Sequence, residues 1–239
     1  YDHVLICGPV FPHEVVGFSG GTKYLFPGIA ASEIIHFTHW LGALITSSDV
    51  LGTIDTPIRA VINRAAALLD TPISLLALVV TYDGVAGVYC GEAAGNHDAW
   101  RQAAALSGRR HIVWLDAPVR QVLSVMPPMY ADIWTAGKGM YKIEPVVADG
   151  GEVIIYAPHI NEVSFTHGHQ IEEVGYHCRD YFLAQPERFA GYPGGVLAHS
   201  THVKGQGRYD AATGIETPRV TVTLATGTSP ERCQRINLG

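Results

Sequence analysis

A glycine-rich segment near the start of the chain contains the residues best suited to chemistry. It reads Gly17-Phe-Ser-Gly-Gly-Thr-Lys23, and His13 precedes it. Glycine lets the backbone approach a ligand closely and adopt conformations that a Cβ atom forbids. A lysine after such a loop can contact a phosphate or act as a nucleophile. His13 is a candidate general base, because the pKa of an unperturbed imidazole, roughly 6.5, lies near working pH.

The loop does not match the phosphate-binding Walker pattern, and a histidine downstream offers a metal ligand. Thr22 precedes Lys23 and Tyr24 follows it, so G-x-x-x-x-G-K-[ST] is not met. A tight turn with a solvated lysine is the alternative interpretation.

His39 lies on an expected helix, where a neutral imidazole suits nickel, copper, iron or zinc. His36 competes for this role, and a histidine satisfied by ordinary core or surface contacts is the alternative.

The elements that must position these residues alternate between strands and helices in the first part of the chain. Apolar runs and turn signals predict the strands, and capping residues predict the helix starts. The expected strands are 4–10, 73–81 and 85–90, the last two as a hairpin. The expected helices are 32–44, one that starts at Pro57 with Thr56 as its cap, and one that runs to Leu106 with Asn96 as its cap.

The polar stretch Ser107–Arg110 marks the expected domain boundary, and the alternation starts again beyond it. The expected strands there are 111–115, 119–125, 152–157, 196–199 and 220–225. The expected helical regions are 135–147, closed by Gly150-Gly151, and 172–183. Strands separated by helices favour an α/β fold. We therefore expect two α/β domains, 1–108 and 109–239, with mixed sheets flanked by helices.

Composition excludes several classes of partner. The chain has 239 residues, 47% of them hydrophobic, and 16 Lys+Arg against 22 Asp+Glu leave a net charge of −6. This acidic balance lacks the basic stripe that nucleic acid or an anionic membrane requires. No tract approaches the roughly 18 apolar residues of a membrane helix. The four cysteines form no C-x-x-C pair, which favours free thiols in a reducing cytoplasm.

The segment from His13 to Glu33 resembles the signature of the nickel-pincer nucleotide-dependent lactate racemase family. That family shares the core P-H-x-x-x-G-F-S-G-G-x-K-x-x-x-P-G, followed by a helical histidine. A second stretch, Ile133-Trp-Thr-Ala-Gly-Lys138-Gly-Met140, is similar to the family's substrate-lysine loop. The resemblance covers most of the chain, and it is strongest in residues 8–39 and weaker after 150.

The resemblance implies how a cofactor would be held. Lys23 would bind it covalently through a thioamide, and the cofactor would be a pyridinium-derived nickel-pincer nucleotide. His39 would complete the coordination of nickel, beside the carbon and the two sulfurs of the pincer. Ser19, Gly20 and Gly21 would form the cofactor-binding loop. The enzymes that make this cofactor would be partners of the protein.

The resemblance also implies a reaction. The protein would racemise or epimerise a small 2-hydroxy acid, similar to lactate, by reversible hydride transfer to the cofactor. His13 would be one of two acid/base histidines, Lys138 would bind the substrate carboxylate, and the active site would lie in the cleft between the domains. The family's D-x-T-R-P loop does not occur in this sequence. We therefore expect the chain to lack the family's amino-terminal segment, which contains the second acid/base histidine.

Two other functions stay open at this point. A metal-dependent hydrolase or lyase would use His167, His169 and His199, although polar loop or interface histidines are the simpler interpretation. A non-catalytic nucleotide-binding domain would hold a phosphate on the glycine loop without chemistry. A cytoplasmic location is expected in each case, and a homo-oligomer is an open alternative.

Overall fold

The chain folds into two compact α/β units in this computed structural model, which describes residues 1–238. Unit 1 consists of Tyr1–Ile45 and Asp49–Trp114. Unit 2 consists of Thr46–Ser48 and Leu115–Gly239. Gly239, the last residue of the expected second domain, lies outside the described residues. The boundary expected after residue 108 falls inside a helix, and the units divide after Trp114 instead.

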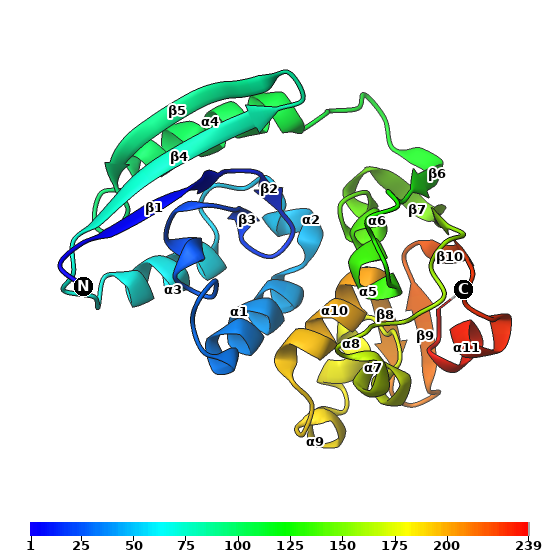
Figure 1. Cartoon of the computed structure of the whole chain (residues 1–239). Coiled ribbons are helices and arrows are strands. Elements are labelled where there is room, and N and C mark those ends of the chain that lie inside the picture. Colours follow the sequence, from blue (N-terminus) through cyan, green and yellow to red (C-terminus); the bar gives the residue numbers. More distant parts are fainter. Residues whose placement is uncertain (239) are drawn as a thin grey trace. The chain divides into compact units, whose positions relative to one another are not determined.

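Unit 1 is built on a three-stranded mixed sheet with the order β1-β4-β5 (Figure 1). Its strands are β1 (Val4–Pro9), β4 (Ile73–Thr81) and β5 (Gly84–Glu92). β1 runs parallel to β4, while β4 and β5 form the expected antiparallel hairpin. Alternate residues of β4 are buried, as a strand with one covered face requires.

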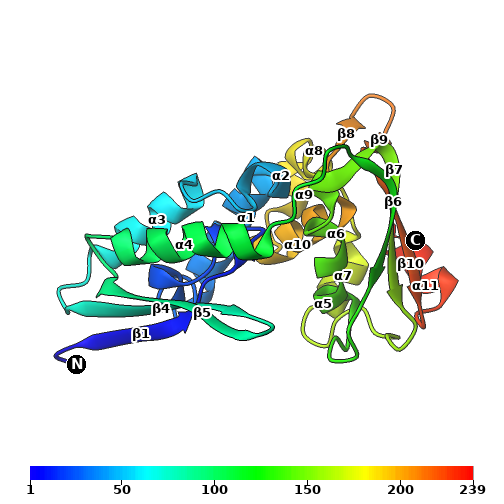
Figure 2. The ribbon, with the colours of Figure 1, turned by 90° about the horizontal axis from the view of Figure 1, so that it is seen from above.

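The helices of unit 1 are α1 (Ser32–Ile45), α3 (Pro57–Ala66) and α4 (Asp98–His111), and the short α2 (Ser47–Val50) follows α1. α4 packs on the sheet, whereas α1 and α3 pack on each other. Figure 2 shows α4 running along β4 and β5. The Thr56 hydroxyl accepts a hydrogen bond from the amide of Arg59 at 3.1 Å, so the predicted cap of α3 is confirmed.

Helix α4 differs from its prediction at both ends. Its N-cap is His97 rather than Asn96, whose side chain instead accepts a hydrogen bond from the amide of Asp98 at 2.9 Å. The helix continues to His111, so the polar stretch is helical and the strand expected at 111–115 does not form. The His111 ring packs back on the preceding turn and on the carbonyl of Val80 at 3.0 Å.

The glycine-rich segment lies in unit 1 between short elements. β2 (Pro12–His13) pairs antiparallel with β3 (Gly17–Phe18), and a 3-10 turn, η1 (Gly21–Tyr24), follows. Gly20 and Gly21 have φ values of 76° and 60°, which an L-residue with a Cβ atom rarely adopts. The expectation that glycines of this segment adopt conformations that a Cβ atom forbids is therefore confirmed.

Unit 2 has a three-stranded parallel sheet with the order β10-β7-β6 and a separate antiparallel hairpin. The sheet consists of β6 (Val119–Val125), β7 (Val147–Ala157) and β10 (Thr221–Thr226), and the hairpin of β8 (Gly207–Asp210) and β9 (Ile215–Pro218). The main sheet is thus parallel rather than mixed. Its core is a large cluster of buried aliphatic side chains around Val153, Ile155 and Val222.

Short helices cover this sheet, and α5, α6 and α7 lie on one face of it in Figure 2. The helices of unit 2, with the 3-10 turn η2, are α5 (Ile133–Ala136), α6 (Lys138–Tyr141), η2 (Glu144–Val146), α7 (Gly168–Val174), α8 (Arg179–Leu183), α9 (Pro186–Phe189), α10 (Gly194–Lys204) and α11 (Pro230–Arg235). Within residues 1–238 no helix has the length and apolar character needed to cross a bilayer.

Three predictions in unit 2 are wrong. The strand expected at 196–199 lies within α10, where every residue from Val196 to Val203 is buried, so no amphipathic pattern distinguishes helix from strand. Gly150-Gly151 lies inside β7 and ends no helix. The helix expected at 172–183 is divided into α7 and α8 by Gly175, whose φ of 75° ends the first of them.

Candidate functional site

Three of the predicted functional residues lie in unit 1. His13 ends β2, Lys23 lies in η1, and His39 lies in the second half of α1. The fourth, Lys138, begins α6 of unit 2. The structure therefore brings the predicted cofactor lysine, metal ligand and acid/base histidine into one compact unit, while the predicted substrate lysine belongs to the other.

Lys23 and His39 share one electrostatic environment. Burial lowers the pKa of Lys23, the charge of Arg59 lowers it further, and the carboxylate of Glu14 opposes both. Burial also lowers the pKa of His39, a hydrogen bond to the backbone opposes this, and the charge of Lys23 again lowers it. Both effects favour the uncharged forms, which are the forms that react as a nucleophile and bind a metal.

The ring of His39 is oriented by its own helix. Nδ1 lies 2.7 Å from the carbonyl oxygen of Ile35, one turn earlier, so Nδ1 is the protonated nitrogen. The lone pair of the neutral ring is then on Nε2, as in metal-binding histidines whose other nitrogen donates to a carbonyl. His36, the competing candidate, has a buried Nδ1 with no hydrogen-bond partner in the described part of the chain.

His13 has the opposite tautomer. Its Nδ1 accepts a hydrogen bond from the amide of Val15 at 3.1 Å, so the proton of the neutral ring is on Nε2. The carboxylate of Glu14 lies 3.7 Å from the same Nδ1 and would stabilise the protonated ring. The neutral ring therefore presents Nε2–H as a hydrogen-bond donor.

The glycine-rich loop is held by side chains from α3 and α4 that the sequence did not single out. Arg59 donates to the carbonyls of Phe18 and of Gly20, the latter at 3.2 Å. Trp100 donates from Nε1 to the carbonyl of Ser19 at 2.9 Å. No spacing pattern pointed to either residue, because both lie far from the loop in sequence.

Ser19 has a structural role in addition to any part in binding a cofactor. Its hydroxyl accepts from the amide of Phe11 at 2.8 Å and lies 3.4 Å from the carbonyl of Pro9. Gly21 is constrained by Trp100, because a Cβ atom there would lie 2.9 Å from the indole ring. The roles of Ser19, Gly20 and Gly21 in cofactor binding stay predictions.

Lys138 follows a well-capped turn of unit 2. Asp132 caps α5 by accepting from the amide of Thr135 at 2.9 Å and from its hydroxyl at 2.7 Å. The Lys138 ammonium lies 5.6 Å from the centre of the Tyr130 ring, within cation-π range. Its role as the carboxylate-binding residue also stays a prediction.

The three histidines of the alternative metal site do not converge. His169 is 87% exposed and pairs with Glu173. The rings of His167 and His199 each pack on Trp134, with centroid distances of 4.5 and 3.8 Å, and the Nε2 of His199 lies 3.2 Å from the Tyr176 hydroxyl. Nowhere in residues 1–238 do three or more His, Cys, Asp or Glu side chains form a group that could hold a metal. The alternative of a three-histidine metal site is therefore wrong.

The fold and this geometry define a class of protein: two α/β units, the first of which presents a half-buried lysine after a glycine-rich loop. Comparison with known families agrees with this description. Residues 1–73 match the lactate racemase N-terminal domain. The resemblance to the lactate racemase family that the sequence indicated is therefore confirmed.

Solved structures extend the similarity to the whole chain. A crystal structure of a protein from Thermotoga maritima has a TM-score of 0.90 and 35% sequence identity, over 100% of this chain and 60% of that one. The lactate racemase apoprotein from Thermoanaerobacterium thermosaccharolyticum has the same fold, with a TM-score of 0.72 and 20% identity over 99% of this chain and 54% of that one. This chain thus spans little more than half of the second protein. No curated protein matches the sequence.

Proposed function

We propose that this chain supplies the cofactor lysine, the metal ligand and one acid/base histidine of a racemase or epimerase that acts on a 2-hydroxy acid. The observation that carries the proposal is that Lys23, His39 and His13 belong to one unit, within the region that matches the lactate racemase N-terminal domain. The shared environment of Lys23 and His39 supports it, because each favours the uncharged form.

The residues fit a nickel-pincer nucleotide. Covalent attachment to a lysine requires an unprotonated amine, and burial lowers the pKa of Lys23 in that direction. Coordination by histidine requires a ring nitrogen with a lone pair, which the hydrogen bond from Nδ1 of His39 leaves at Nε2. Lys23 would therefore hold the group and His39 would ligate its nickel. When bound, the group would supply a hydride acceptor.

The other residues would move protons and bind the substrate. A 2-hydroxy acid that loses its α-hydrogen as hydride must lose its hydroxyl proton to a base, and the product is a planar 2-keto acid. Return of hydride to the opposite face inverts the centre, and a proton then returns to the oxygen. His13, as an imidazolium, would donate this proton and become the neutral imidazole, and Lys138 would bind the carboxylate. The acid/base partner on the opposite face would come from outside the matched region.

The proposal implies a setting for the protein. The cofactor-making enzymes would be its partners, the substrate would be a small 2-hydroxy acid, and the location would be cytoplasmic. We also retain a homo-oligomer as a proposal. The full-length protein is the form in which activity should be measured, because the chain spans only part of its relatives.

Intact mass and nickel content test the proposal. Full-length protein made together with the cofactor-making enzymes should gain a covalent mass increment that maps to Lys23, with about one nickel per chain. Lys23→Ala should lose both the increment and racemisation, whereas Lys142→Ala, at an exposed lysine, should lose neither. His39→Ala should keep the covalent increment and lose nickel. An unmodified, nickel-free Lys23 in the wild-type protein would contradict the proposal, and unchanged nucleotide binding by Lys23→Ala would favour a non-catalytic binding domain.

A further inference from the structure

The Arg59 guanidinium is buried in unit 1 without a carboxylate partner. The residue is 3% exposed, and burial lowers its pKa to about 9. No ion pair with a carboxylate is formed by Arg59 anywhere in residues 1–238, and its Nε has no hydrogen-bond partner there. Burying an unpaired charge costs several kcal/mol, so a neutral side chain would serve better if filling space were the only requirement.

The guanidinium is used instead on the glycine-rich loop. One terminal nitrogen donates to the carbonyl of Gly20 at 3.2 Å and the other to the carbonyl of Phe18. Its carbon lies 4.2 Å from the centre of the Trp100 ring, whose Nε1 donates to the carbonyl between them, that of Ser19, at 2.9 Å. Three consecutive carbonyls are therefore held by two side chains that also stack on each other.

The same helix holds the next turn of the loop. Asn63, one turn after Arg59 on α3, accepts a hydrogen bond from the Thr22 hydroxyl at 2.7 Å. Thr22 directly precedes Lys23, and its carbonyl accepts from the amides of Leu25 and Phe26 at 3.0 Å. The clamp, defined as Arg59, Asn63 and Trp100, thus ends one residue before the proposed cofactor lysine.

We propose that Arg59 is a positioning residue for Lys23: its planar, two-armed head fixes the loop carbonyls so that the lysine is presented in one geometry. The charge of Arg59 also disfavours the protonated amine of Lys23. This inference rests on the proposed function of Lys23. Lysine could not replace Arg59 fully, because a single ammonium lacks the rigid fork that reaches two carbonyls.

Hydrogen exchange on the full-length protein without cofactor tests the geometric part. The amide of Ser19 donates to the carbonyl of Phe11, and the amides of Lys23, Leu25 and Phe26 donate to carbonyls within the loop, so their exchange reports its opening. In Arg59→Met we expect these amides to exchange roughly tenfold faster or more, because two hydrogen bonds from a charged group are lost. Arg59→Lys should be intermediate. The matched control is Arg101→Met, which removes an exposed arginine paired with Asp55 and should behave as wild type.

Acylation of Lys23 by an amine-reactive acetylating reagent, measured by peptide mass spectrometry against pH, tests the electrostatic part. Loss of the charge in Arg59→Met should raise the midpoint of the profile, so that a smaller fraction of the Lys23 amine is neutral at a given pH. Arg59→Lys should keep the wild-type midpoint. A merely structural residue would change exchange but not this midpoint.

Two outcomes would overturn the proposal: wild-type loop exchange in folded Arg59→Met, or an unchanged Lys23 midpoint in that variant. If Arg59→Met does not fold, the variants Arg59→Lys and Trp100→Phe test the proposal, since each removes only part of the hydrogen bonding to the loop carbonyls. Wild-type exchange of the loop amides in both variants would overturn the proposal. The readouts do not need the cofactor. Failure to attach it to Lys23 would therefore contradict the proposed function alone.

Discussion

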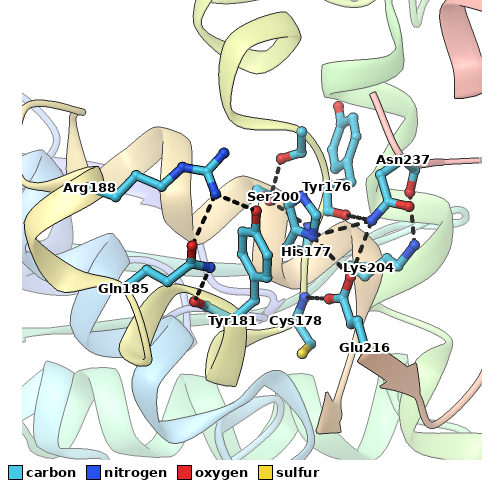
Figure 3. Close-up of polar contacts among 11 residues, drawn as sticks. Tyr176, His177, Cys178, Tyr181, Gln185, Arg188, Ser200, Lys204, Glu216 and Asn237 are labelled. Carbon is cyan, nitrogen blue, oxygen red and sulfur yellow. Dashed lines mark hydrogen bonds and ion pairs between the residues drawn. The ribbon is translucent and has the colours of Figure 1, made fainter. Parts of the chain in front are cut away.

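Glu216 in unit 2 and Arg59 in unit 1 are both largely buried charged side chains, but only Glu216 has matching partners. Figure 3 shows the His177–Glu216 node, defined as His177, Lys204, Glu216 and Asn237. His177 Nδ1 lies 2.9 Å from one oxygen of Glu216, and the amide of Cys178 donates to the other at 2.5 Å. Arg59, by contrast, donates to two carbonyl oxygens and stacks on an indole ring, and it forms no ion pair with a carboxylate within residues 1–238.

The node also ties down the last described part of the chain. Asn237 donates from Nδ2 to the carbonyl of Tyr176 at 2.9 Å and to Glu216 at 3.2 Å, and its own carbonyl accepts from the Lys204 ammonium at 2.8 Å. A fully satisfied buried network contributes to a unique packed structure, whereas a buried charge without a counter-charge indicates a local task. The difference indicates that the buried charges of the His177–Glu216 node stabilise the packing of unit 2, whereas Arg59 holds the glycine-rich loop of unit 1.

The largest expected effect is loss of the Glu216 carboxylate. Glu216→Gln should destabilise unit 2 by about 2 kcal/mol, because His177 and the Cys178 amide lose a charged acceptor in a largely buried place. Exchange of the β7 amides would measure this in unit 2, while the β4 amides would report unit 1 separately. Glu187→Gln, at an exposed carboxylate of α9, is the control and should change little. Equal stability of Glu216→Gln and Glu187→Gln would show that the partners of Glu216 do not stabilise unit 2.

A smaller effect is expected in the acid dependence of stability. Hydrogen bonds from His177 and from the Cys178 amide overcome the opposing effect of burial and lower the pKa of Glu216 to about 2, whereas the unfolded value is roughly 4.3. Stability from this group is therefore complete above the unfolded pKa and is lost as pH falls toward about 2. The protection of β7 amides should fall more steeply from pH 5 to 3 in wild type than in Glu216→Gln. Parallel curves would contradict the assignment.

The smallest expected effect is on the global stability of Arg59→Met. Removing the charge relieves its burial cost and loses two hydrogen bonds, so the free energy of unfolding of unit 1 should change by less than about 1 kcal/mol. The exchange of β4 amides checks this while the loop amides change strongly. A loss comparable to that of Glu216→Gln would show that Arg59 supports the unit as a whole.

Much of unit 1 could be predicted because its signals are local. Thr56 before Pro57, the turn Asp83-Gly84 and the apolar run 73–81 each specify an element from a few neighbouring residues. The candidate residues His13 and Lys23 were found because the glycines between them permit a close approach of the backbone to a ligand, and the resemblance to a known family pointed to His39.

Unit 2 was less predictable from the sequence, because the wrong predictions concern elements whose hydrophobic residues do not recur with a helical or strand period. Helix α10 is buried on all sides from Val196 to Val203, so its apolar run was equally compatible with a strand. The pair Gly150-Gly151 is typical of a helix end, yet the amide of Gly150 donates to the carbonyl of Arg219 at 2.8 Å and continues strand β7. Such a partner is distant in sequence, and local propensity does not encode it.

The sequence by itself determined the residue types that can do chemistry, the glycines that permit the loop, and the relationship to the lactate racemase family in residues 1–73. Only the tertiary structure decided what surrounds these residues. It selected the tautomers of His13 and His39 through backbone partners, lowered the pKa of Lys23 by burial, and placed Arg59 and Trp100 on the loop. The physical reason is that burial and hydrogen-bond partners depend on contacts between distant segments, which form only when the chain folds.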